Sequence, residues 1–308
     1  MNPAPSIVLF TTAAGAGYGL LFWLGLLWPL GLVPRDAGFG LAALVVALVL
    51  VSIGLLSSTA HLGRPERAWR ALSQWRSSWL SREGVAALLT FVPAVLFGLA
   101  LWAGVPALAA LCGLLAAAGA AATVWCTGMI YASLKPIRQW HHPLTAPNYL
   151  ALAAFSGVAL LAAIAAVAGA GFTVPALLAA LLGVVAAMLK RRYWRAVDTA
   201  PPLATVESAT GLGAIGRTRP LDPPHTQANW LLREMGFRVA RKHAAKLRRI
   251  ALAAGFAAPV MLALLSLVVA PAALLVLGAV SALAGLLVER WLMFAEATHT
   301  VTLYYDGR

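Results

Sequence analysis

The sequence has few charged residues, and very few of those are acidic. Only 11% of its 308 residues are charged and 61% are hydrophobic, with 10 Asp and Glu against 23 Lys and Arg. An ordinary soluble domain has about 25% charged and about 45–50% apolar residues. The composition excludes such a domain and predicts a polytopic membrane protein.

Cysteine is nearly absent as well. The two cysteines, Cys112 and Cys126, lie in apolar sequence fourteen residues apart. This spacing is neither a CxxC pair nor an iron–sulfur ligand set. We expect both to be small core residues, and we expect no metal site in this chain.

Histidine is missing from the middle of the long apolar runs. A transmembrane b-type haem commonly takes its axial ligands from histidines on spanning helices. Here every histidine maps to a predicted connection or to the end of a span: His61, His141, His142, His225, His243 and His299. The spans also lack the scattered carboxylates and broken helices of transporters. We therefore expect no haem, and a transporter remains only an alternative.

Eight apolar runs are long enough to cross a membrane, which takes about 20 residues each. Short connections that contain Pro or Gly join them into four hairpins. The predicted spans are 6–28, 38–60, 84–104, 106–134, 148–169, 172–189, 250–270 and 272–299. The first run has no basic segment before it, so we expect a retained span and no cleaved signal peptide. The predicted fold is all-α, an eight-helix bundle in a single membrane domain, residues 1–308.

The basic residues collect on one side of this predicted bundle. The N-terminus, the three long connections and the C-terminus hold 21 of the 23 Lys and Arg. The other two are Arg35, in a short connection, and Arg290, in the last span. The positive-inside rule places the basic side in the cytoplasm, with both termini inside, in the inner membrane of a bacterium. The net charge of +13 then indicates orientation and a docking face, and not nucleic-acid binding.

The connection 190–249 is the one sizeable segment outside the predicted spans. Its first half is rich in Pro, Gly and Thr and is typical of irregular chain. Its second half places Trp230, Leu231, Met235 and Val239 at helical intervals between basic residues. That pattern predicts an interfacial helix leading into the seventh span, with a plain solvated helix as the alternative.

Two connections on the basic side share an unusual composition. Residues 57–84, SSTAHLGRPERAWRALSQWRSSWLSREG, combine three tryptophans with five arginines, and residues 129–150, MIYASLKPIRQWHHPLTAPNYL, repeat the mixture. Such residues collect at membrane–water boundaries, so an ordinary aromatic and basic collar is one interpretation. Two collars on one side also form a platform for a soluble partner, with polar groups at the bilayer edge for a quinone head group.

The side chains of these collars are the candidate site residues. For the quinone head group we expect contacts from Arg64, Tyr131 and Lys135. The remaining basic residues and the paired histidines are the predicted partner-docking residues: Arg67, Arg70, Arg76, Arg82, Arg138, His141 and His142.

Acidic residues on the last span suggest a proton path. Glu289 and Glu296 are seven residues apart and share one helix face, and His299 follows at the basic end. This stack is able to conduct protons to a site near the cytoplasmic surface. The alternative is a polar helix end paired with neighbouring arginines.

Small residues in the first span predict close helix packing. Gly15 and Gly19 are four residues apart in TTAAGAGYGLL, the spacing of a GxxxG contact. Tyr18, between them, is able to face a cofactor pocket.

Several segments together resemble one known family. HLGRPERAWRAL, RSSWLSRE, MIYASLKPIRQWHHP and the N-terminal PAPSIVLFTTAAGAGYGL are similar to the membrane anchors of dimethyl sulfoxide reductase, the DmsC type. The resemblance runs over essentially the whole chain. Members of this family are eight-span proteins without haem.

The resemblance implies one member of a complex of three subunits that exchanges electrons with ubiquinone or menaquinone. The partners would be an iron–sulfur subunit and a molybdopterin catalytic subunit. A histidine at the position of His61 belongs to the quinol site in the family, and an imidazole suits the exchange of protons with a quinone.

The family includes cytoplasmic enzymes, such as the membrane-bound sulfite dehydrogenase, whose anchor the chain also resembles. The cytoplasmic basic side favours sulfite oxidation with quinone as the acceptor. The alternatives are the anchor of a dimethyl sulfoxide reductase that oxidises menaquinol, or a purely structural anchor.

Overall fold

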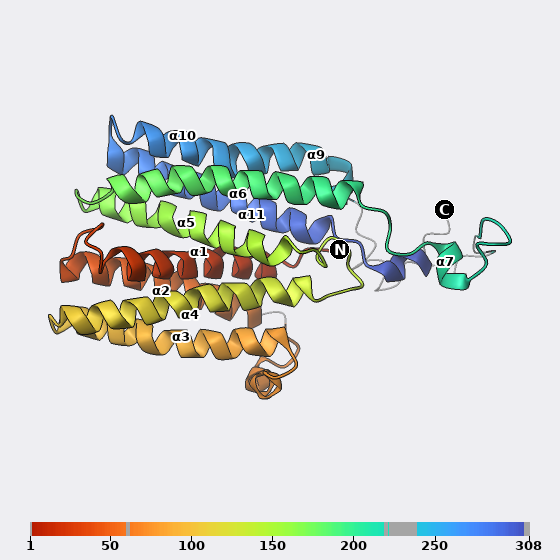
Figure 1. Cartoon of the computed structure of the whole chain (residues 1–308), viewed down its shortest axis with the longest axis horizontal. Helices are drawn as coiled ribbons and strands as arrows, with labels where there is room; N and C mark the ends of the chain where they lie inside the picture. The colour runs from red at the N-terminus through yellow and green to blue at the C-terminus, as the bar shows by residue number, and fades with distance from the viewer. Residues whose placement is uncertain (1, 60–61, 219–220, 222–238, 305–308) are drawn as a thin grey trace.

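The computed structural model of the chain is a bundle of long helices that run roughly side by side (Figure 1). It describes residues 2–59, 62–218, 221 and 239–304, with the backbone alone at 239–242 and 304. Eight of the described helices are long and apolar enough to cross a membrane. The predicted all-α class and the eight spans are therefore confirmed. Seven of the spans are α1 (Pro5–Leu27), α2 (Ala37–Thr59), α3 (Trp79–Trp102), α4 (Pro106–Ala132), α5 (Thr145–Val167), α6 (Thr173–Thr199) and α11 (Pro271–Ala295).

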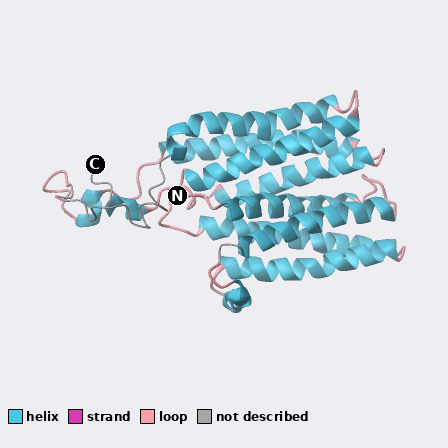
Figure 2. Ribbon diagram, turned by 180° about the vertical axis from the view of Figure 1, so that it is seen from behind, coloured by secondary structure: helices cyan, strands magenta, loops and turns pink. Residues whose placement is uncertain are grey.

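Helix α1 lies at the centre of the bundle and packs against α2, α4, α5 and α11. Helices α1 to α4 form one half, and α5, α6 and the later helices form the other (Figure 1). The long connections lie together at one end of the bundle, as the view from behind also shows (Figure 2). We call this the basic end. It carries η1 (Pro65–Gln74), the connection 133–144, α7 (Val206–Thr210) and η3 (Thr300–Tyr304).

Glycines allow α1 to approach its neighbours closely. A Cβ atom on Gly19 would collide with the backbone of Ala153 on α5, and one on Gly25 would collide with Gly113 on α4. The predicted close packing therefore holds at Gly19. It does not hold at Gly15, which has open space beside it. The backbones of α1, α4 and α5 meet where no side chain separates them.

Two helix ends differ from the predicted spans, and both differences bring charged residues into helices. Helix α3 begins at Trp79, five residues before the predicted start, because Ser78 caps it by accepting a hydrogen bond from the Ser81 amide at 3.4 Å. Helix α6 continues to Thr199, ten residues past the predicted end, since no helix breaker occurs before Pro201. The long loop therefore begins after α6 rather than at residue 190.

The seventh span is made of three consecutive segments. They are α9 (Val239–Leu252), the π-helical turn η2 (Ala253–Ala257) and α10 (Ala258–Leu265). The π turn ends two residues before Pro259, which cannot donate a hydrogen bond to the preceding turn. Local π adjustments of this kind satisfy the backbone groups that a proline frees in a membrane helix. Of the predicted interfacial helix, Trp230, Leu231 and Met235 lie outside the described residues, whereas Val239 begins α9. The interfacial helix stays a prediction.

Candidate functional site

A cavity of about 780 Å³ lies at the basic end, between η1 and the ends of α1 to α4. Its volume falls in the range of about 300–1,000 Å³ that is usual for small-molecule sites. Most of its wall is apolar, which suits a hydrophobic ligand that arrives from the membrane. The apolar wall includes Ile7, Phe10, Leu55, Leu72, Leu80 and Ile130.

A few polar side chains interrupt this apolar wall. Arg64 and Arg67 line it from the segment that carries η1, and Glu83 lines it from the N-terminal part of α3. Glu83 is only 5% exposed, and its carboxylate accepts a hydrogen bond from the Thr127 hydroxyl on α4. Within the described part of the chain, no cation lies at ion-pair distance from Glu83. A buried carboxyl of this kind, beside a cavity, is suited to exchange protons with a ligand.

Aromatic rings form the wall of the cavity that faces the second half of the bundle. Tyr131 packs against Trp140, Tyr149 and Phe294, with ring centroids 5.2, 5.6 and 5.4 Å away. The indole of Trp140 donates a hydrogen bond to the Met293 carbonyl at 2.8 Å. This hydrogen bond and the ring contacts hold Tyr131 in place at the cavity and connect it to α5 and α11.

A cluster of buried charges lies behind these rings. Glu289 on α11 pairs with Lys190 on α6 and, at 2.9 Å, with the adjacent Arg290. The three residues are at most 3% exposed. The Arg290 guanidinium lies 4.0 Å from the centre of the Tyr149 ring, and the Lys190 ammonium lies 4.3 Å from that of Tyr193. Each cation therefore has both a carboxylate and an aromatic face as partners.

The three residues predicted to transfer protons lie in separate contacts. Glu289 belongs to the buried cluster, whereas Glu296 pairs with Arg248 at 2.9 Å. The same Arg248 also pairs with Asp198 at 2.6 Å. The ring Nδ1 of His299 accepts a hydrogen bond from the Val301 amide at 3.1 Å. These contacts favour the alternative of a polar helix end paired with arginine, and proton transfer along these residues stays a prediction.

The structure brings together two of the predicted quinone-binding residues. Arg64 and Tyr131 both line the cavity. Lys135 is exposed on the connection after α4 and does not line it. His61 lies outside the described residues, although its neighbours Leu62 and Gly63 line the cavity.

Three of the predicted docking arginines are exposed at the basic end, and Arg67 among them also lines the cavity. The three are Arg67, Arg70 and Arg76. Arg70 and Arg76 lie over the rings of the adjacent Trp69 and Trp75, at 5.6 and 5.5 Å from their centres. Their charged groups remain accessible to a partner.

Arg82 is held more tightly than the other docking arginines. Its guanidinium donates to the carbonyls of Trp75, at 3.0 Å, and Arg76, at 2.8 Å, and it covers the Trp79 ring at 4.3 Å. These contacts tie the end of η1 to the start of α3. Arg82 therefore shapes the connection itself.

The docking residues of the second connection are partly committed to contacts within the chain. Arg138 donates to the Val197 carbonyl at 3.5 Å, and the exposed His141 lies 2.6 Å from the Ala132 carbonyl. The Nδ1 atom of His142 accepts a hydrogen bond from the Leu144 amide at 3.1 Å. Partial burial lowers the pKa of the His142 imidazole below its ordinary value. His142 is thus neutral at pH 7.

The sequence reasoning missed Glu83, Lys190 and Tyr149 as site residues. The Ser77–Ser78 pair before Trp79 is a helix-capping signal that would have placed Glu83 inside α3. The uninterrupted run up to Pro201 would have placed Lys190 inside α6. No sequence signal indicates that Tyr149 meets Arg290, because their contact joins distant helices.

Comparison with known proteins identifies the family of the chain. Residues 1–306 match the family described as DMSO reductase anchor subunit (DmsC). The chain is also 34% identical, over 324 aligned residues, to a sulfite dehydrogenase subunit from Allochromatium vinosum, with 100% of this chain and 99% of that protein covered. The expected family is thereby confirmed: the chain belongs to the DMSO reductase anchor subunit family, and it is a multi-pass membrane subunit of an oxidoreductase complex.

Proposed function

We propose that the chain is the quinone-reactive anchor of a three-subunit oxidoreductase, and that the 780 Å³ cavity is its quinone site. The single observation that carries this proposal is the cavity itself, apolar in most of its wall and lined by Arg64, Glu83 and Tyr131. A quinone has an apolar tail and a head group with two carbonyls. The apolar wall suits the tail, and the three polar residues suit the head group.

Each polar residue has a distinct role in this proposal. Arg64 and the Tyr131 hydroxyl are hydrogen-bond donors for the quinone carbonyls, and such bonds strengthen as charge develops on the oxygen. A bound quinone supplies the two-electron, two-proton acceptor chemistry. The Glu83 carboxyl holds a proton at one of its oxygens and transfers it to the ligand. His61 is a further proton carrier, as the family resemblance implies.

Electrons reach this site from partner subunits that dock on the basic end. The exposed Arg67, Arg70 and Arg76 suit an acidic patch on an iron–sulfur subunit. The substrate site lies on a molybdopterin subunit. We propose sulfite as the substrate, since the relative from A. vinosum is named as part of a sulfite dehydrogenase. The basic end then faces the cytoplasm, and quinone is the electron acceptor.

Filling the cavity tests the proposed site. Ala71 lines the cavity from η1, whereas Ser73, two residues on, is exposed and does not line it. In the purified complex, Ala71→Phe should remove bound quinone and lower quinone-linked turnover at least about 10-fold. Turnover with a soluble artificial acceptor should stay unchanged. Ser73→Phe is the matched control and should affect neither activity. Full quinone content in Ala71→Phe would rule out this cavity as the site.

Orientation and substrate need tests of their own. A reporter fused after Arg308 should be active in the cytoplasm, and activity in the periplasm alone would reverse the proposed orientation. Sulfite-dependent quinone reduction by the isolated complex tests the substrate. Quinol oxidation coupled to sulfoxide reduction would instead support the dimethyl sulfoxide reductase type.

A further inference from the structure

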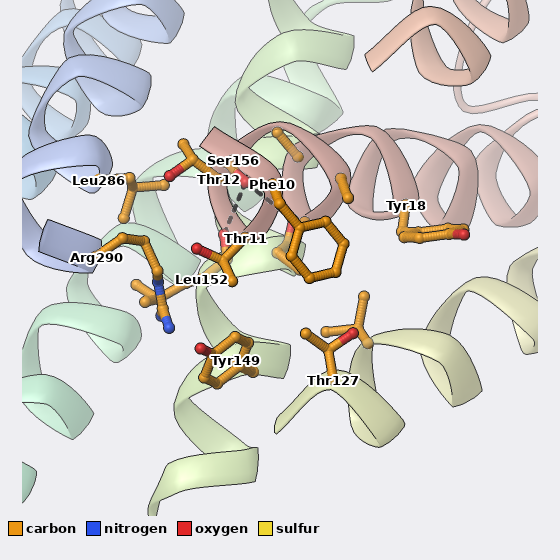
Figure 3. Close-up of a pocket in the computed structure, with 15 residues that line it drawn as sticks. Phe10, Thr11, Thr12, Tyr18, Thr127, Tyr149, Leu152, Ser156, Leu286 and Arg290 are labelled. Atoms are coloured by element: carbon orange, nitrogen blue, oxygen red, sulfur yellow. Dashed lines mark hydrogen bonds between the residues drawn. The ribbon is translucent and has the colours of Figure 1, made fainter. Parts of the chain in front are cut away.

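A second, much smaller cavity lies inside the bundle, between α1, α4, α5 and α11 (Figure 3). Its volume of about 20 Å³ is enough for one water molecule, which needs about 10–15 Å³ measured in this way. Arg290 and Tyr149 lie on one side of it, and Thr127 lies opposite, with Tyr18 further along α1 (Figure 3). The remaining polar wall is formed by Thr11, Thr12 and Ser156.

The polar groups around this cavity are not satisfied by the protein alone. The hydroxyls of Tyr149 and Tyr18 are buried, and neither makes a hydrogen bond of normal geometry to the described residues. Thr11, Thr12 and Ser156 donate to carbonyls of their own helices, so their hydroxyl oxygens can still accept a bond. Buried polar groups are almost always paired with protein or ordered water. This wall therefore has the donors and acceptors that hold a buried water.

The charged groups on the two sides of the cavity differ. On one side, Glu289 pairs with both Lys190 and Arg290. On the other side, Glu83 has no cation at ion-pair distance within the described chain. Thr127 lines the small cavity and donates its hydrogen bond to Glu83. A buried carboxylate without a paired cation is costly, and a polar path from it to a guanidinium lowers that cost.

We propose that the small cavity is a water-binding site that links Arg290 and Tyr149 to Thr127, and through Thr127 to Glu83. The positive charge of the Arg290 guanidinium at the cavity wall thereby favours the ionised form of Glu83. Arg290 is a positioning residue in this arrangement, since it acts on Glu83 through water and does not touch the quinone cavity. The importance of this coupling for turnover rests on the proposed quinone function, but the ionisation of Glu83 is measurable without quinone.

Other groups also face Glu83 and set the background of its titration. They come from the elements packed around it: Tyr18 on α1, Cys126 and Tyr131 on α4, and Arg64 and Arg67 on the segment that carries η1. Only the two arginines carry charge at neutral pH. They lie across the quinone cavity, so variants at Arg290 and Tyr149 leave them unaltered.

Infrared titration of the Glu83 carboxyl in the purified complex tests the proposal, with Glu83→Gln identifying the signal. Arg290→Gln should raise the pH at which Glu83 ionises by about 1–2 units, the usual scale for the loss of a nearby opposite charge. Tyr149→Phe removes one ligand of the water and should shift the midpoint in the same direction by a smaller amount. Thr90→Val, a buried threonine on α3 that does not line the cavity, is the control and should not shift it.

Two further readouts keep the test decisive. An experimental map should show density for a water between Arg290, Tyr149 and Thr127. If Arg290→Gln does not assemble, Tyr149→Phe alone decides, and an unshifted midpoint in that variant together with a dry cavity overturns the proposal. If the midpoint shifts while the wild-type complex binds no quinone, the water link stands and the proposed function fails.

Discussion

The two halves of the bundle differ in the partners that they give to buried charged residues. In the half formed by α1 to α4, Glu83 is buried beside an open cavity, and its hydrogen-bond partner is a threonine hydroxyl. In the other half, Lys190, Glu289 and Arg290 are in direct ion pairs and fill the space between their helices. Burial alone therefore does not mark a reactive group. A buried carboxyl without a cation among the described residues, next to space for a ligand, indicates chemistry, whereas a fully paired one indicates helix association.

The strongest way to break this comparison is to remove the carboxylate of the paired half. Glu289→Gln leaves Lys190 and Arg290 buried beside each other without an anion. Breaking a buried ion pair typically costs about 3–5 kcal/mol. We expect a loss of that size in the free energy of unfolding of the solubilised protein. Glu66→Gln, at an exposed position on η1, is the control and should change little. A stable Glu289→Gln protein would mean that the cluster does not hold the helices together.

The equivalent change in the other half should affect activity instead. Glu83→Gln keeps the shape of the side chain but removes its ability to exchange protons. Quinone-linked turnover should fall about 10²-fold, the usual scale for the loss of a positioned acid–base group. Turnover with an artificial acceptor should be retained, as should the unfolding free energy. Equal losses in both activities would mean that Glu83 has a structural role, as Glu289 has.

A smaller effect is expected where charges of the second half reach the surface. Asp198 pairs with Arg248, but its side chain is 52% exposed. Arg248 also retains Glu296 as a partner. Asp198→Asn should therefore lower the unfolding free energy by only about 0.2–1 kcal/mol, and the difference should shrink at high salt. A loss as large as that of Glu289→Gln would show that exposure does not distinguish these pairs.

The smallest effect concerns His142, because partial burial lowers its pKa. The unfolded chain has the ordinary histidine pKa of about 6.5. Above that pH both states are neutral, so His142 contributes no pH dependence. As the pH falls below about 6.5 the unfolded state takes up the proton first, and stability falls. His142→Gln should therefore reduce this acid-side loss. If wild type and His142→Gln lose stability identically as the pH falls, His142 does not contribute to the acid-side loss.

The sequence was sufficient for the architecture but not for the full site. Apolar length alone identified all eight spans, because a membrane imposes one length on every crossing helix. The sequence also indicated Arg64 and Tyr131 as residues of the candidate site, since the aromatic and basic composition of their connections is unusual. Glu83 was missed because the predicted third span began at residue 84, one residue after Glu83, whereas α3 begins at Trp79.

The charge clusters could not be predicted from the sequence, because they depend on which helices become neighbours. Lys190 meets Glu289, and Arg290 meets Tyr149, only after α5, α6 and α11 have packed together. Periodicity within one helix predicts which residues share a face, as it did for Glu289 and Glu296, but it does not predict the partner across that face. Three-dimensional contacts decided that the two glutamates belong to different ion pairs.

The central position of α1 has a consequence for how the protein is made. Its Trp23 indole donates a hydrogen bond to the Ala154 carbonyl at 2.8 Å, and the two residues are 131 positions apart in the chain. At about 5–20 residues per second of synthesis, the first helix waits roughly ten seconds in the membrane before that partner exists. Gly19, which packs against Ala153 on α5, is unpacked for the same period. Chains that stop before α5 should therefore expose this side of α1 to the proteases that remove incomplete membrane proteins, whereas chains that reach α5 have begun to cover it.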